Sequence, residues 1–257
     1  MNTQINIGQP RDWWNTLALG ALVLAVFLII WFGACSSTSS STINMREAAP
    51  NVNAPAATAA SASAAVTTAE SVPQSLANAG EYGENVYDYA KANDWKNADV
   101  KLAALRDAAR QVRTDVKNNS AAVERLDGSV VALDRAVSSK DRQATMREAN
   151  QVTLDVANLT TAYKLSVPVE VIRLDYYGRE LEVWAQAKDA NKLQAAAREM
   201  RRTWDALRPA IEGKSATEVK KFAALVAQVE SAKTPADYAR VATPVLDEVD
   251  NLEKLFP

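Results

Sequence analysis

Residues 71–90 read SVPQSLANAGEYGENVYDYA, and residues 166–185 read SVPVEVIRLDYYGRELEVWA. Both stretches begin with Ser-Val-Pro, and the Tyr-Gly pair of the first returns in the second at the same offset of 95 residues (166 minus 71). The same offset aligns later positions, namely Leu105, Val112, Val116 and Ser120 with Met200, Leu207, Ile211 and Ser215. Self-similarity of this kind defines the folding unit. The sequence therefore predicts a duplication, with copy 1 over residues 71–165 and copy 2 over residues 166–257.

Each copy has the apolar spacing of four amphipathic helices. In the second predicted helix of each copy, the apolar residues are three or four positions apart. The two sets are Ala98, Leu102, Leu105, Ala109, Val112 and Val116 in copy 1, and Leu193, Ala197, Met200, Trp204, Leu207 and Ile211 in copy 2. This spacing places one narrow, coiled-coil-like apolar stripe on a helix. Because no segment alternates as a strand would, we predict an all-α fold.

Start signals mark the boundaries of these helices. Pro73 and Pro168 suit a first helical turn, and Ser215 and Thr234 each precede an acidic residue by three positions, as in a capping box. Further predicted N-caps are Asp94, Ser120, Asp141 and Asp189. Only a few residues separate successive helices, so sequential helices should be antiparallel neighbours. Each copy is therefore predicted to fold as an up-and-down four-helix bundle, giving two bundles in tandem.

A stack of helical hairpins of the HEAT or TPR kind is the alternative architecture. Each copy divides into two hairpins of about 47 residues, a length within the range of such repeats. The two hairpins of one copy do not resemble each other, however, and there are only two copies. Open stacks generally need three or more repeats with caps. We therefore favour the two bundles.

Residues 17–34, LALGALVLAVFLIIWFGA, form an uncharged apolar run of 18 residues. At about 1.5 Å per residue, such a helix covers most of a hydrocarbon layer of roughly 30 Å. Trp13, Trp14 and Trp31 flank it, as aromatic residues do at membrane interfaces. The segment is predicted to be a transmembrane helix. Arg11 on its N-terminal side favours a cytoplasmic segment over residues 1–16 and an extracytoplasmic remainder.

The same run also resembles a lipoprotein signal segment. Phe-Gly-Ala-Cys at residues 32–35 fits a lipobox in its small residues, which would make Cys35 a lipidated first residue. Against this interpretation, Phe32 replaces the usual leucine and the apolar run exceeds the 7–15 residues typical of a signal peptide. Both hypotheses place the rest of the chain on a membrane surface outside the cytoplasm. The location is the periplasmic side of the inner membrane for an anchor, or the outer membrane if Cys35 is lipidated.

Residues 35–70 are rich in Ser, Thr, Ala, Asn and Pro and contain no aromatic residue. Such a composition cannot bury enough apolar surface to offset the entropy of ordering the chain. We predict a flexible linker whose root-mean-square reach is roughly 30 Å.

The composition excludes several classes of function. The chain has 29 Lys and Arg against 31 Asp and Glu, so it lacks the basic surplus of a nucleic-acid-binding protein. It contains no histidine, which excludes Ser-His-Asp catalysis and Glu-x-x-His di-iron sites. A single cysteine cannot form an intrachain disulfide or a thiolate zinc site. We predict no enzyme activity, no cofactor, no metal and no nucleic-acid partner.

Two glycines fall inside predicted helices, on their apolar stripes. Gly83 and Gly178 should allow a neighbouring helix to approach closely, because glycine in a helix interior otherwise costs about 1 kcal/mol relative to alanine. The alternative is a notch that admits a ligand beside Tyr82 or Tyr177.

Copy 2 has large and charged residues where copy 1 has smaller ones. One hypothesis is a pocket between helices that binds a small anion, lined by Arg173, Tyr177, Trp184, Trp204 and Arg208. In the alternative, the tryptophans belong to the core and the charges form exposed i,i+4 pairs, such as Asp175 with Arg179. The basic run Arg198, Arg201, Arg202 and Arg208 is similarly interpreted as a solvated helix face rather than an anion site.

These features predict a non-enzymatic, membrane-tethered helical-bundle protein of the bacterial envelope. It would bind another envelope protein or act as an accessory or scaffold subunit, held to the membrane by residues 17–34 or by lipid on Cys35. A small-anion or metal-binding ectodomain, with its pocket in copy 2, is the alternative.

Overall fold

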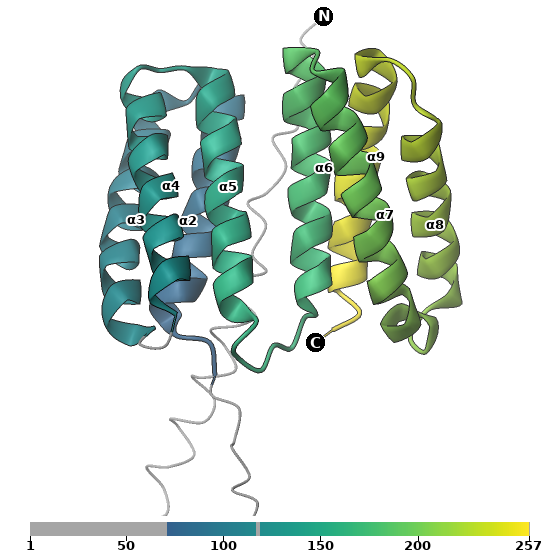
Figure 1. Ribbon diagram of the computed structural model, residues 1–257, viewed down its shortest axis with the longest axis horizontal. Coiled ribbons are helices and arrows are strands. Elements are labelled where there is room, and N and C mark those ends of the chain that lie inside the picture. Colours follow the sequence, from purple (N-terminus) through teal and green to yellow (C-terminus); the bar gives the residue numbers. More distant parts are fainter. Residues whose placement is uncertain (1–70, 117–118, 257) are drawn as a thin grey trace, which may run out of the picture.

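The computed structural model describes residues 71–116 and 119–256, and within them it has eight α-helices and no β-strand (Figure 1). The helices are α2 (Gln74–Lys91), α3 (Trp95–Asp115), α4 (Ser120–Ser138), α5 (Arg142–Thr160), α6 (Val169–Ala187), α7 (Ala190–Glu212), α8 (Ala216–Ser231) and α9 (Pro235–Glu253). The all-α prediction is confirmed for this part of the chain. No helix in it is long and apolar enough to cross a membrane. The predicted membrane segment, linker and lipidation site lie outside the described residues.

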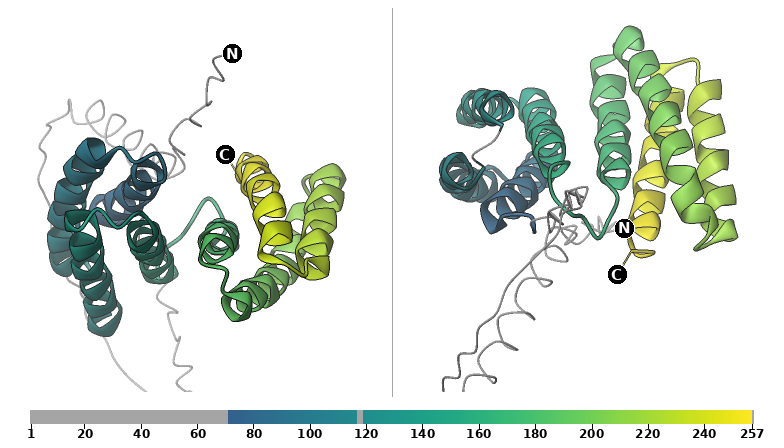
Figure 2. Two further views of the ribbon diagram at one scale, coloured as in Figure 1. Left: turned by 90° about the horizontal axis from the view of Figure 1, so that it is seen from above. Right: turned by 60° about the horizontal axis from the view of Figure 1, so that its bottom comes forward.

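Helices α2 to α5 form a closed ring. Each helix packs on the next, and α5 returns to pack on α2 (Figures 1 and 2). The stripes of all four helices therefore face one shared core, which includes Leu76, Val86, Leu105, Leu126, Leu133 and Met146. An open stack of hairpins would leave a face of its end helices uncovered, whereas this ring covers the stripe of each helix.

Helices α6 to α9 form a second ring with the same connectivity, in which α9 packs back on α6 (Figure 1). Its core is built around Trp204 of α7 and Phe222 of α8, whose ring centroids lie 4.8 Å apart and whose side chains are fully buried. Leu174, Leu181, Met200, Val245 and Leu252 complete this centre.

Side-chain caps fix several helix starts. Asp94, Asp141 and Asp189 each accept a hydrogen bond from the backbone N–H three residues later, as predicted. Thr234 and Asp237 form a full reciprocal capping box. The structure corrects one predicted cap: Ser120 is already inside α4, because the chain enters the helix one residue earlier, at Asn119.

The two glycines on the apolar stripes lie where a first helix meets the last helix of its ring. A Cβ atom on Gly83 would lie 3.1 Å from Val152 Cγ1 of α5, and one on Gly178 would lie 2.5 Å from Leu246 Cδ2 of α9. Gly178 therefore lets α6 and α9 approach more closely than a side chain would allow. Gly128 of α4 differs, because a Cβ atom added there would meet no such neighbour within 4 Å.

This difference gives a matched pair of alanine variants. Gly178→Ala should lower the free energy of unfolding by about 1–3 kcal/mol, because Leu246 is buried and must leave its place. Gly128→Ala should raise it by up to about 1 kcal/mol, because the exposed helix gains propensity without a clash. Urea unfolding of residues 71–257, followed by helical circular dichroism, measures both. Equal stabilisation by the two changes would contradict the close approach at Gly178.

Candidate functional site

The two rings meet where α6 packs against α5 (Figures 1 and 2). Helix α6 is buried on two sides. Leu174 and Leu181 belong to the second core, whereas Ile172 and Val183 of the same helix belong to the first. Partly buried Trp184 packs against both cores. One helix therefore joins the two bundles through apolar contacts.

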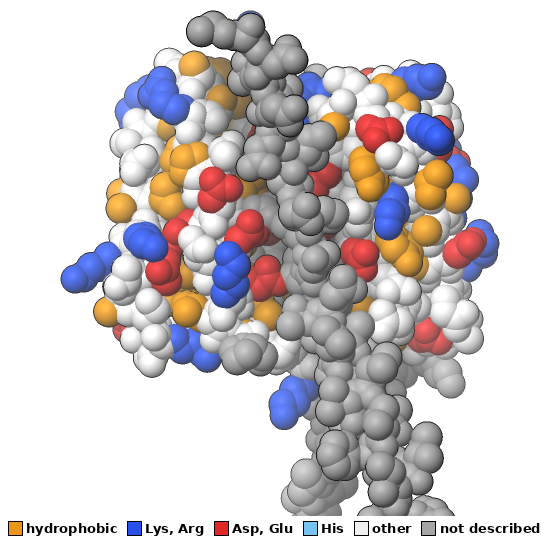
Figure 3. All heavy atoms as spheres, turned by 180° about the vertical axis from the view of Figure 1, so that it is seen from behind, with side chains coloured by type: hydrophobic (Ala, Val, Ile, Leu, Met, Phe, Trp, Pro, Cys, Tyr) orange, Lys and Arg blue, Asp and Glu red, His pale blue; other side chains and the backbone are white. Residues whose placement is uncertain are grey.

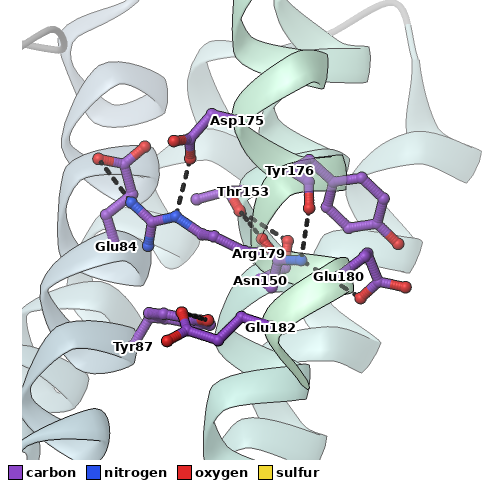
Figure 4. Close-up of polar contacts among 9 residues, drawn as sticks. All are labelled: Glu84, Tyr87, Asn150, Thr153, Asp175, Tyr176, Arg179, Glu180 and Glu182. Atoms are coloured by element: carbon purple, nitrogen blue, oxygen red, sulfur yellow. Dashed lines mark hydrogen bonds and ion pairs between the residues drawn. The ribbon is translucent and has the colours of Figure 1, made fainter. Parts of the chain in front are cut away.

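A buried arginine lies at the centre of this junction (Figure 4). The side chain of Arg179 is 1% exposed, and its Nε donates a hydrogen bond of 2.8 Å to Asp175 Oδ2. Its Nη2 lies 3.8 Å from Oε2 of Glu84, on α2 of the other bundle. Its guanidinium also lies 4.7 Å from the ring centroid of Tyr87. Burial by itself lowers the pKa of Arg179, but attraction to Asp175 and Glu84 outweighs it and raises this pKa above its ordinary value.

A second contact between the bundles continues this network. Tyr87 of α2 donates a hydrogen bond of 2.8 Å to Glu182 Oε2 of α6 (Figure 4). Lys91, one turn along α2, forms an ion pair of 2.6 Å with the other oxygen of Glu182. Burial raises the pKa of the Tyr87 hydroxyl well above its ordinary value, so it remains a donor at neutral pH.

Both contacts join equivalent positions of the repeat. Glu84 and Arg179 are 95 residues apart (179 minus 84), and so are Tyr87 and Glu182. In two identical copies the first pair would be two glutamates or two arginines, and buried like charges repel. The junction therefore depends on the two bundles having different residues at these paired positions.

A third polar group lies on the α5 side of the junction. Asn150 is fully buried, and its Nδ2 donates to the backbone oxygen of Tyr176 at 3.1 Å and to Glu180 Oε1 at 3.3 Å (Figure 4). Trp184 Nε1 donates to Glu180 Oε2 at 2.6 Å. Burial raises the pKa of Glu180, and these two donors partly oppose the rise.

The junction fixes structure rather than contacting solutes. Glu84, Asp175 and Arg179 are each at most 5% exposed, so a substrate in solution does not reach them. This corrects one sequence expectation: the Asp175–Arg179 pair is buried between bundles, not exposed on a helix surface. Within residues 71–116 and 119–256, no group of three or more acidic or cysteine side chains is arranged to hold a metal ion.

The structure places the five predicted ligand-binding residues in different surroundings. Trp204 is fully buried in the second core, Trp184 binds Glu180, and Tyr177 is partly buried. Arg173 donates to Asn158 of α5 at 3.3 Å, and exposed Arg208 pairs with Glu212 at 3.3 Å. None of the five lines the groove described next.

A solvent-accessible groove lies in the second bundle, between the first half of α7 and the α8–α9 connection. Its volume is about 470 Å3. Four cationic side chains and one carboxylate line it: Arg198, Arg201, Arg202, Lys233 and Glu230. We call this site the basic groove. Arg201 holds Glu230 through two hydrogen bonds of 2.8 and 2.6 Å, which fixes both side chains in the wall.

The basic groove contrasts with the wider charge distribution. The whole chain has a net charge of −2. On the face drawn in Figure 3, basic and acidic side chains are mixed over both bundles. A local surplus of three positive charges (four minus one) therefore sets the basic groove apart.

In comparisons with known proteins, the chain matches no family model, no curated protein and no solved structure.

Removal of the central cation should be costly. In Arg179→Met, Glu84 and Asp175 stay buried beside an apolar side chain, so we expect a loss of about 3–5 kcal/mol in the free energy of unfolding. Arg208→Met is the matched control, because it removes an arginine from an exposed i,i+4 pair and should cost no more than about 0.5 kcal/mol. Urea unfolding of both variants measures the difference. A loss below about 1 kcal/mol for Arg179→Met would contradict the central role of this residue.

Stability should have a maximum in mild acid. Burial raises the folded-state pKa of Asp155 and Glu180, so folding favours their protonated forms and stability rises as the pH falls from 7 through those values. A hydrogen bond from Arg201 lowers the folded-state pKa of Glu230, and hydrogen bonds from Thr234 lower that of Asp237. The ionised carboxylates therefore stabilise the fold, and this contribution to the free energy of unfolding is lost as the pH falls below the ordinary carboxyl range. The melting temperature should therefore rise as the pH falls from 7 toward the ordinary carboxyl range near about pH 4, and it should fall below that range.

The Asp155→Asn variant checks the origin of the rising limb. Its amide oxygen can still accept the hydrogen bond from Ser129, but it does not titrate. The rise in melting temperature below pH 7 should be smaller in this variant. A steady fall in melting temperature from pH 7 in the unchanged protein would refute the assignment.

Proposed function

We propose that this chain is a non-enzymatic, membrane-tethered protein of the bacterial envelope, whose two helical bundles form one rigid module that binds another envelope protein. The observation that carries the proposal is the buried ion network around Arg179. It links Glu84 of one bundle to Arg179 and Asp175 of the other. A network of this kind favours one arrangement of the two bundles, because any other arrangement that kept Arg179 buried would separate it from Glu84. A fixed arrangement is useful to a scaffold or an accessory subunit.

The position of Ser71, where the described chain begins, supports a tethered module. Ser71 forms an isolated parallel bridge with Lys164, in the connection from α5 to α6. The preceding residues therefore join the module at the end where α2 and α6 begin (Figure 1). In the proposal, residues 17–34 or a lipid on Cys35 hold this end toward the membrane, and residues 35–70 supply the reach. The opposite end carries the α6–α7 and α8–α9 connections, and a flexible linker leaves the orientation of the module relative to the membrane free.

The composition supports a binding role over catalysis. A chain without histidine lacks the most common general acid and base near neutral pH. The best-organised charged cluster of the described residues is closed to solvent. The accessible basic groove combines cations with an apolar floor, as binding sites do. A small-anion-binding ectodomain is the second candidate, and the same groove favours it.

Photocrosslinking with the full chain in intact cells tests the proposal. A photoreactive amino acid is placed at exposed positions on both bundles, such as Val100 of α3 and Val131 of α4, and around the basic groove. We expect at least one position to give a discrete adduct with another protein, while neighbouring positions on the same module do not. Adducts with lipid or with the chain itself alone, at all positions, would count against a partner.

Intact mass spectrometry of the purified protein separates the two anchoring hypotheses. A transmembrane anchor predicts the mass of the complete chain, with residues 1–34 retained. A lipoprotein predicts loss of those residues and addition of acyl chains to Cys35. Release of an unmodified, truncated chain into the soluble fraction would contradict both.

A further inference from the structure

We infer that the basic groove binds an acidic peptide segment of the partner protein, one with two or more carboxylates next to an apolar side chain. This inference rests on the proposed function and assigns its binding site and the chemistry of the ligand.

Two cations of the groove are left unpaired within residues 71–116 and 119–256. Arg201 is held by Glu230, and Arg202 pairs with Glu199 on an exposed helix surface. Arg198 and the ammonium group of Lys233 have no hydrogen bond or ion pair within the described residues. Two exposed cations on opposite walls of one groove are therefore available to a ligand. Carboxylates are suitable partners, because charge-assisted hydrogen bonds with them are strong and directional.

The floor of the groove is apolar. Leu193, Ala197 and Tyr238 lie almost wholly buried beneath it, and Ala190, Ala232 and Pro235 form the apolar surface that solvent still reaches. A ligand that places an apolar side chain against this floor gains from the hydrophobic effect as well as from charge. A purely ionic ligand would use only the cations.

The open shape of the groove favours a peptide over a small free anion. Arg198, Arg202 and Lys233 are exposed, so a single small anion beside one of them would remain largely hydrated. Small-molecule sites usually enclose most of the ligand surface. A peptide can reach both walls and the floor at once, and arginine clusters recognise acidic motifs in this way.

The chain's own linker does not supply such a segment. Residues 36–70 contain only two acidic residues, Glu47 and Glu70, separated by more than twenty positions. The groove also lies at the end of the second bundle opposite to Ser71, formed by the start of α7 and the α8–α9 connection (Figure 1). A segment from another protein is therefore the occupant that charge and position favour.

Fluorescence anisotropy with labelled peptides tests the inference, using the full chain in nanodiscs of neutral lipid. The probe is a twelve-residue peptide of Glu, Asp and Leu, and the control peptide has Gln and Asn in place of the acids. We expect the acidic peptide to bind at least about tenfold more tightly at 50 mM salt, with affinity falling as salt rises. Equal binding of both peptides would overturn the inference.

Charge-removal variants locate the site. Arg198→Gln combined with Lys233→Gln should weaken binding of the acidic peptide at least about tenfold, because both removed cations face the groove. The matched control is Arg208→Gln combined with Lys220→Gln, which removes two exposed cations of the second bundle outside the groove and should change binding less than about twofold. The positions are exposed, so melting curves should stay unchanged. Equal weakening by both pairs would mean non-specific attraction and would refute the site.

Two further outcomes distinguish this inference from the proposed function. If citrate or phosphate at low millimolar concentration displaced the peptide completely, the groove would be a small-anion site and the peptide assignment would be wrong. If photocrosslinking found a partner protein on α3 or α4 while the peptide did not bind, the groove inference would fail and the proposed function would stand. Peptide binding without any partner adduct in cells would support the groove and count against the proposed function.

Discussion

The arrangement of the two bundles depends on the environment of one guanidinium group. A buried arginine that lacked partners would be too costly to keep, because taking a charge out of water costs several kcal/mol. Asp175 lies on the same helix and can accompany Arg179 whatever the neighbouring bundle does. Glu84 belongs to the other bundle, and Tyr87 from that bundle covers the guanidinium face. Arg179 therefore lies beside both carboxylates only when α2 and α6 keep one register.

The repeat explains why this register is unique. Two identical copies would place like residues opposite each other, whereas the present copies place Glu84 against Arg179 and Tyr87 against Glu182. Helix α6 has also gained a second apolar face, through Ile172 and Val183, which pack into the core of the first bundle. The equivalent helix α2 instead packs within its own ring. The two bundles thus form an asymmetric module, in which α6 is the link.

Much of the helical content could be predicted from the sequence, because stripes with steps of three and four residues and caps such as Asp141 and Asp189 are local signals. The junction could not be predicted in the same way. Asp175 and Arg179 are spaced as an exposed helix pair would be, and only the packing of α6 against α2 and α5 buries them. One signal was present: Ile172 and Val183 lie off the main stripe of their helix, which indicates burial on two sides. The basic groove needed tertiary information, since Lys233 and Arg198 are far apart in sequence.

Arginine residues in this chain have opposite roles according to their surroundings. Arg179 is paired within the fold, because Asp175 and Glu84 are buried with it, and of its three guanidinium nitrogens Nε makes a hydrogen bond within the described residues. Arg201 is partly used, since Glu230 fixes it in the groove wall while it stays accessible. Arg198 makes no hydrogen bond or ion pair within the described residues, and its exposed position keeps its charge hydrated at little cost. A charge that does not stabilise the fold costs the folded state little at such an exposed position, and it is available to a ligand.

Because the Arg179 network fixes the second bundle against the first, the charge of Arg198 lies at a constant distance from Ser71, where the linker joins the module. Within the proposed tethered module, the linker would then set how freely the groove moves and how far from the membrane it reaches, and the junction would keep the groove at one place in the module.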